Sequence, residues 1–237
     1  MLVILVDGNE PVQAVGWSPE NLSRAIASFR NLADTVKVLP VSHLETSFGD
    51  GGLDGAIFCP LTTELTADNL PEMERSHPLL AIASRCGDTE AIRQQVIGNL
   101  HCDAGAGTFW LPIVVTAKGP LYAEAIGSGA SNDADGENTA DGENKHYQQP
   151  FYLSDRQRQA VYRLGHQVLE ILEAPPAVYL LRLGLAAEGQ EGVKVWFDRV
   201  LPFPGEPAIA SLGIQTPNLF HCHWRCITHQ PIRDITI

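Results

Sequence analysis

Two apolar segments in the last third of the chain, 178–185 and 193–201, constrain the fold most. Each has the length and the branched aliphatic content of a buried strand. A turn at 187–192 joins them, and Pro202-Phe203-Pro204 and a short final helix follow. The segment before them predicts a helix that begins with a capping box, Ser154 with Gln157. Strands that alternate with amphipathic helices predict a mixed α/β fold, of α+β character in this half.

The first hundred residues also alternate short strands and helices. Ser18 followed by Pro19 predicts a helix start, and Asp88 predicts another. The predicted strands are an opening strand that begins at Met1 and ends at Asp7-Gly8, and then 35–40, 56–59 and 79–84. We therefore expect a small N-terminal sheet covered by helices, within an α/β fold. Asp7 follows the first strand, and since the chain has neither Gly-x-Gly-x-x-Gly nor a phosphate-loop lysine motif, we interpret it as a turn former.

A connector of small residues, 103–108, predicts a domain boundary. We expect a small α/β domain over 1–102 and a second domain over 103–237. Within the second domain, Ala-Asp-Gly-Glu-Asn occurs at 134–138 and again at 140–144. The spacing of its acids misses that of a calcium loop by one residue, so 128–146 is predicted to be a disordered acidic insertion.

The segment 177–237 resembles the closing half of ATP-grasp ligases of the phosphoribosylaminoimidazole carboxylase (ATPase subunit) type. The resemblance rests on Pro202 and Pro204 after the second strand, and on the motif Leu-Phe-His-Cys-His-Trp-Arg-Cys at 219–226 with Gln-Pro-Ile at 230–232. Phe220, His223, Arg225 and Pro231 are the matching positions there. It extends more weakly back to about residue 109 and implies an ATP-grasp-like fold for 103–237.

The acidic residues of that family are not kept. An Asn-Glu pair of the family falls on Asp198-Arg199, and a metal-binding glutamate of the preceding strand falls on Arg182. Magnesium requires oxygen ligands, which a guanidinium cannot provide, whereas a guanidinium binds phosphate or carboxylate through paired hydrogen bonds. The anion-binding or nucleotide-binding residues we predict are Arg182, Asp198, Arg199, His223 and Arg225. The alternative is that Arg182 and Arg199 pair with Asp198, Glu206 or other neighbours on the sheet.

Cysteine and histidine side chains are concentrated near the C-terminal end. Cys222, Cys226 and His229 would share one face of a continuous helix, which is a start for a zinc site. No Cys-x-x-Cys pair accompanies them, and free cysteine also packs well as a small apolar residue. We therefore keep these three residues as metal candidates but expect zinc to be absent.

The composition of the chain indicates which kinds of partner and which cellular location to expect. A net charge of -12 argues against a nucleic-acid partner, and no apolar run approaches the length of a membrane helix, so no membrane partner is expected. The odd number of scattered cysteines, 5, favours reduced thiols and a cytoplasmic location.

The sequence thus predicts a catalytically degenerate ATP-grasp-like protein, a pseudoenzyme that acts as a binding or regulatory module. Its partner would be a small anion, a nucleotide or another protein, and assembly into a homo-oligomer stays open. No cofactor is expected, although ATP with magnesium is kept as an option. The alternatives are an active ATP-dependent carboxylate ligase with unusual metal ligands, and a metal-binding module at the C-terminal Cys/His cluster.

Overall fold

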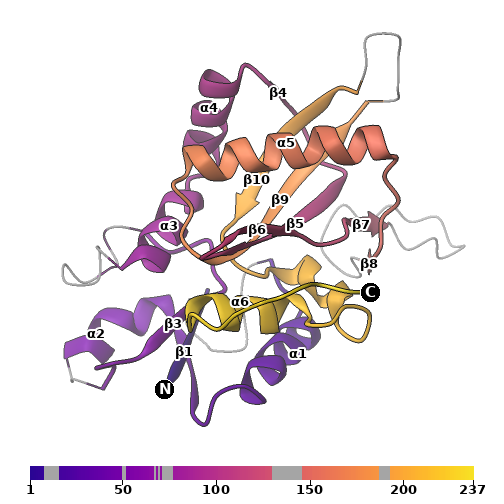
Figure 1. Ribbon diagram of the computed structural model, residues 1–237. Helices are drawn as coiled ribbons and strands as arrows, with labels where there is room; N and C mark the ends of the chain where they lie inside the picture. Colours follow the sequence, from indigo (N-terminus) through magenta and orange to yellow (C-terminus); the bar gives the residue numbers. More distant parts are fainter. Residues whose placement is uncertain are drawn as a thin grey trace, which may run out of the picture.

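The structure is a computed structural model with two sheets that lie one above the other (Figure 1). It describes residues 1–7, 16–49, 52–66, 68, 70, 77–129, 146–186 and 193–237. The smaller sheet has three strands and the larger has seven, and helices cover both. The predicted α/β class is confirmed. No helix in this described part of the chain is long and apolar enough to cross a membrane.

The small sheet is parallel, in the order β2-β1-β3. Its strands are β1 (Leu2–Val6), β2 (Val36–Pro40) and β3 (Ile57–Pro60). Every residue of β1 is buried, as expected for a central strand covered on both faces. Helix α1 (Pro19–Arg30) begins as predicted, because the Ser18 side chain accepts a hydrogen bond from the backbone of Asn21 and proline occupies the first turn. A short turn of helix, η1 (Val41–His43), and α2 (Leu44–Gly49) follow β2.

The large sheet has the order β4-β10-β9-β5-β7-β8, with β6 paired to β5. Its strands are β4 (Asp103–Ala104), β5 (Phe109–Thr116), β6 (Gly119–Tyr122), β7 (Ile126–Gly129), β8 (His146–Gln148), β9 (Ala177–Leu185) and β10 (Val195–Leu201). The two apolar segments predicted as strands are therefore β9 and β10, and they pair antiparallel.

Three helices cover one face of the large sheet: α3 (Pro78–Gly87), α4 (Thr89–Leu100) and α5 (Asp155–Ile171). Helix α5 has the predicted capping box in full, since the Ser154 side chain accepts from the backbone of Gln157 and the Gln157 side chain accepts from the backbone of Ser154. Its buried stripe, which includes Val161, Leu164 and Val168, packs on the sheet.

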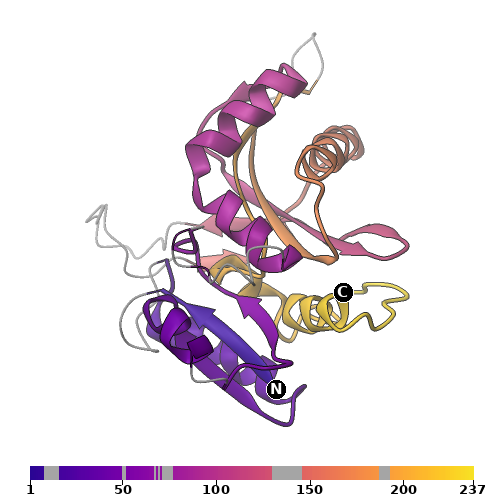
Figure 2. The same ribbon diagram turned by 90° about the vertical axis from the view of Figure 1, so that its left-hand side faces the viewer.

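Helix α6 (Leu219–Ile227) lies on the opposite face of the large sheet, against the small one, as Figures 1 and 2 show. It contacts α1, β5 and β9, and the turn of helix η3 (Glu206–Ser211) lies beside it. The rings of Phe29 in α1 and Phe220 in α6 meet edge to face, with centroids 5.7 Å apart. One hydrophobic core therefore contains residues of both sheets, among them Leu2, Ile4, Val178 and Leu180. The predicted domain boundary at 102/103 stays a prediction.

Two sequence-based expectations differ from the structure. Residues 79–84, predicted as a strand, belong to helix α3, which begins at Pro78. Of the insertion predicted at 128–146, residues 128–129 and 146 lie in the paired strands β7 and β8, and 130–145 lie outside the described residues.

Candidate functional site

An irregularity in strand β10 shapes the candidate site. The pairing of β10 with β9 shifts between Phe197 and Arg199, so Asp198 is an extra residue without an opposite partner. Beyond this bulge, Arg199 lies directly opposite Arg182 of β9. Bulges redirect side chains in this way, because the extra residue alters the alternation of the strand. The result is two arginines side by side on the sheet face that α3, α4 and α5 leave open.

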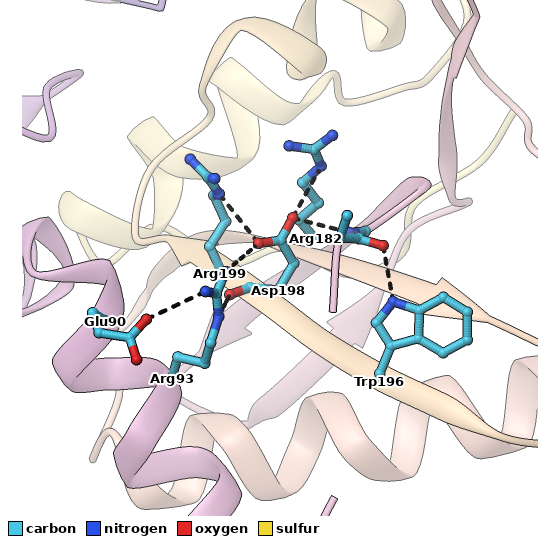
Figure 3. A network of polar contacts seen from close by, with 8 residues as sticks. Glu90, Arg93, Arg182, Trp196, Asp198 and Arg199 are labelled. Atoms are coloured by element: carbon cyan, nitrogen blue, oxygen red, sulfur yellow. Dashed lines mark hydrogen bonds and ion pairs between the residues drawn. The ribbon is translucent and has the colours of Figure 1, made fainter. Parts of the chain in front are cut away.

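Asp198 is the centre of a network of positive groups, drawn in Figure 3. Only 2% of this residue is exposed. Its Oδ1 lies 2.8 Å from Nη2 of Arg93 and 3.6 Å from Nε of Arg199, and its Oδ2 lies 3.4 Å from Nε of Arg182. The backbone N–H of Gly107 donates to Oδ2 at 2.9 Å. Three guanidinium groups thus share one buried carboxylate, so the cluster carries excess positive charge.

Arg93 also fastens helix α4 to the sheet. Its Nε donates to the backbone carbonyl of Asp198 at 3.2 Å, and its Nη1 pairs with the exposed carboxylate of Glu90 at 3.3 Å. Arg182 and Arg199 differ from Arg93, since Figure 3 shows their guanidinium ends directed away from the Asp198 carboxylate. The terminal nitrogens of these two arginines make no hydrogen bond with any described residue. They are therefore available to a ligand.

Both arginines line a cavity of about 380 Å³. The cavity lies where the ends of β1 and β3 approach the open face of the large sheet, which is the usual ligand position in sheets of this kind. Its described lining residues are Asp7, Gly16, Trp17, Leu61, Thr63, Trp110, Ser128, Tyr147, Arg182, Arg199, Leu201, Phe203, Gly205, Glu206 and Pro207. The guanidinium carbon of Arg182 lies 5.7 Å from the ring centroid of Trp110, so the aromatic face helps to hold it in place.

Glu206 lines the same cavity but is already fully bonded. Its Oε1 accepts from the backbone N–H of Ser18 at 2.7 Å and from Nδ2 of Asn21 at 3.2 Å, while its Oε2 accepts from the hydroxyl of Tyr147 at 3.3 Å. Burial, together with the neighbouring Glu206 carboxylate, raises the pKa of the Tyr147 phenol, so it stays a donor. Glu206 therefore stabilises the start of helix α1, where negative charge is favoured.

Asp7 is the second carboxyl group of the cavity. It is completely buried, and the Thr62 hydroxyl donates to its Oδ1. Burial, and then the nearby Glu64 carboxylate, raises the pKa of Asp7 from 3.8 to about 7. The sequence interpretation of Asp7 as a turn former missed this position in the cavity, and its place at the end of a fully apolar strand was the available signal.

The described carboxylates in and beside this cavity do not offer the set of free oxygens that a magnesium ion needs, since Asp7 contributes a single unpartnered oxygen. Magnesium needs several free oxygen ligands in octahedral geometry. Both oxygens of Asp198 face guanidinium groups, and both oxygens of Glu206 accept hydrogen bonds. In the part of the chain that the structure describes, no group of three or more His, Cys, Asp or Glu side chains is arranged to hold a metal ion.

His223 and Arg225, predicted with the arginines, lie elsewhere. His223 is buried in α6, where its Nδ1 accepts from the backbone N–H of Val178 at 3.2 Å. Burial lowers its pKa to about 3, so the imidazole is neutral. Arg225 is exposed on the same helix. Neither residue is among the described residues that line the arginine cavity.

The three metal candidates near the C-terminal end, Cys222, Cys226 and His229, lie in different environments. Cys222 and Cys226 are buried in the core beneath α6, and burial raises the pKa of each thiol to about 12. His229 lies beyond the end of the helix with a φ of 55°, and it lines a second cavity together with Cys226. The structure does not bring these three side chains together as a ligand set.

Arg93 is the member of the cluster that sequence reasoning missed. It lies 105 positions before Asp198 in the chain, on a helix whose other polar residues are ordinary surface groups. No pattern local to α4 separates this arginine from an exposed one, so no sequence signal was available for it.

Comparison with known proteins shows which solved structures this fold is similar to. No protein-family model matches the sequence, and no curated protein matches it either. Similar solved structures include N5-carboxyaminoimidazole ribonucleotide synthetase from Thermus thermophilus, at 9% identity over 99% of this chain and 80% of that chain, with a TM-score of 0.69. Glycinamide-RNase-transformylase T from Mycobacterium tuberculosis matches at 16% identity over 98% and 80%, with a TM-score of 0.66. The phosphoribosylaminoimidazole carboxylase ATPase subunit from Aquifex aeolicus matches at 10% identity over 98% and 78%, with a TM-score of 0.59. The chain therefore has an ATP-grasp-like fold, as the C-terminal resemblance implied.

Proposed function

We propose that this protein binds a small anion, through a phosphate or carboxylate group, between Arg182 and Arg199, and that it does so without magnesium. The observation that carries this proposal is the pair of guanidinium groups on adjacent strands, both facing one cavity. Guanidinium groups bind oxyanions through parallel hydrogen bonds, and the sheet fixes the spacing of the two.

Asp198 supports this role. It lies beneath the arginines and neutralises part of their charge, so they can stay close together before a ligand arrives. It contacts each of them at Nε, which leaves the terminal nitrogens for the anion. A preorganised site of this kind loses little conformational entropy when the ligand binds. The protein would then act as a binding or regulatory module, a pseudoenzyme of the ATP-grasp-like fold.

Titration calorimetry with sulfate, ADP and ATP, each with and without magnesium, tests the proposal. We expect binding that is independent of magnesium and that weakens about tenfold to a hundredfold in Arg182→Gln or Arg199→Gln, since each loses a charge-assisted bond. Arg158→Gln is the matched control, because Arg158 is a half-exposed arginine whose partner Glu124 is 3.9 Å away on the surface. It should bind like the wild type. Binding that requires magnesium would overturn the proposal.

The second candidate function is an active ATP-dependent ligase. It is favoured by the similar structures, which are a transformylase, a synthetase and, in the Aquifex aeolicus case, a carboxylase ATPase subunit. Phosphate release from ATP in the presence of candidate carboxylates separates the two functions. Turnover that disappears in Asp198→Asn, at a temperature where circular dichroism shows that the variant is folded, would support the ligase.

A further inference from the structure

Asp7 is a buried carboxyl group to which the proposed anion site assigns no role. It stands at the carboxyl end of β1 and lines the same cavity as Arg182 and Arg199. The Thr62 hydroxyl donates to its Oδ1, and the backbone of Glu64 in turn donates to the Thr62 oxygen at 2.9 Å. These contacts fix the orientation of the carboxyl group. Its Oδ2 is buried and has no hydrogen-bond partner within the described residues.

The charges around Asp7 decide which form of it is stable. The Glu64 carboxylate repels an ionised Asp7 and burial removes it from water, while the backbone N–H groups of Glu64 and Thr63 offset part of both effects. Arg182 and Arg199 also face the cavity, but they pair with Asp198 and form no ion pair with Asp7. Among the described residues that line the cavity, the remaining ionisable groups are Glu206 and Tyr147, which bond to each other. Asp7 therefore changes between its neutral and charged forms near neutral pH.

A bound anion would favour the neutral form of Asp7. An ionised Asp7 in the same cavity would repel the ligand, whereas the neutral form has an O–H that can donate to a ligand oxygen. An unpartnered buried donor or acceptor costs free energy that a ligand contact would recover.

We propose that the cavity takes up its anion together with one proton, and that Asp7 holds this proton as a neutral carboxyl group that donates from Oδ2 to the ligand. The ligand class is an anion with acceptor oxygens at two ends, one for the arginines and one for Asp7. This inference rests on the proposed anion site and adds a residue that selects the ligand and couples its binding to pH.

The probe is ethanedisulfonate, whose two sulfonate groups stay ionised throughout the pH range of the test. Its affinity is measured by calorimetry across about pH 5.5 to 8.5 in buffers of different ionisation enthalpy, which reports the protons taken up. For the wild type we expect uptake approaching one proton above about pH 7, and affinity that falls by up to about tenfold per pH unit there. Asp7→Asn should bind with an affinity that no longer depends on pH and should take up no proton.

Asp54→Asn is the matched control, since Asp54 is exposed in the segment before β3. It should keep the pH dependence of the wild type. Proton uptake by the wild type needs no variant, so the test holds even if Asp7→Asn fails to fold. Wild-type binding that is independent of pH and takes up no proton would overturn the role of Asp7 and leave the anion site intact. Absence of binding at every pH would overturn both.

Discussion

Replacement of Asp198 by asparagine should destabilise the fold and strengthen anion binding at the same time. The substitution keeps the shape of the side chain but removes the negative charge that three guanidinium groups share. Breaking a buried ion pair by removal of one partner costs about 3–5 kcal/mol. The arginine side chains are 27%, 33% and 42% exposed, so water screens the repulsion that remains and the lower end applies. A loss of about 3 kcal/mol corresponds to a decrease in Tm of about 6–12 °C for a domain of this size.

Thermal and urea unfolding, followed by circular dichroism, measure the stability of this variant, and sulfate titration measures its affinity. The affinity should rise, because loss of the Asp198 negative charge makes the electrostatic potential at the terminal nitrogens of Arg182 and Arg199 more positive. Glu90→Gln is the control, since Glu90 is 64% exposed and its contacts with Arg93 and Gln94 lie on the surface, at the edge of the cluster. The stability of this variant should change by about 0.5 kcal/mol or less. If Asp198→Asn has the stability of the wild type, the cluster does not depend on this carboxylate and our reasoning is refuted.

Three further predictions concern single buried positions. His223→Leu should cost about 1–3 kcal/mol by leaving a backbone N–H without its acceptor. The pKa of His223 in the folded protein, about 3, is below the unfolded value of 6.5, so the wild type loses stability as the pH falls from 6.5 towards 3. Urea unfolding at several pH values should show a smaller loss of stability in the variant. Asp7 has the opposite pH dependence, because its pKa in the folded protein, about 7, exceeds the unfolded value of 3.8. Its contribution to the stability of the wild type is therefore lost as the pH rises from 3.8 through 7. The stability of Asp7→Asn should vary less with pH over this range. Gly184→Ala would place a methyl group inside the indole of Trp196, so the variant should be destabilised by about 1–3 kcal/mol and its tryptophan fluorescence should change. Its control is Gly98→Ala, in an open position of α4, which should stabilise the protein by about 0.5–1 kcal/mol.

Local signals in the sequence predicted local structure well. Ser18 with Pro19, Asp88 and the Ser154 capping box each mark the first turn of a helix in the structure. Such signals work because the hydrogen bonds they describe join residues three positions apart.

Helix α3 shows where the pattern of apolar residues misleads. Its segment was predicted as a strand because apolar residues follow one another without a polar face. In the structure Leu80 and Ala83 pack towards the small sheet, while Leu79, Ile82 and Cys86 pack towards the large sheet. A helix buried on two sides has no polar stripe, so periodicity cannot separate it from a buried strand.

The candidate site was predictable only in part. The family resemblance singled out Arg182, Asp198 and Arg199 on the two predicted strands, and their pairing was one of the alternatives that the sequence left open. The bulge that brings all three together is a property of the strand pairing, and Arg93 and Asp7 arrive from other parts of the chain. Contacts between distant segments leave no trace in local spacing.

The position of α6 has a consequence for how the chain matures during synthesis. Leu219, Phe220 and Cys222 fill the same core as Leu2 and Ile4, so strand β1 is made well before the residues of α6 that complete its packing. Until the residues of α6 are made, only α1 covers this apolar face of the small sheet, and the part that stays exposed is open to chaperones and to self-association. Formation of the first sheet alone therefore does not complete this core, which closes only when α6 has been made.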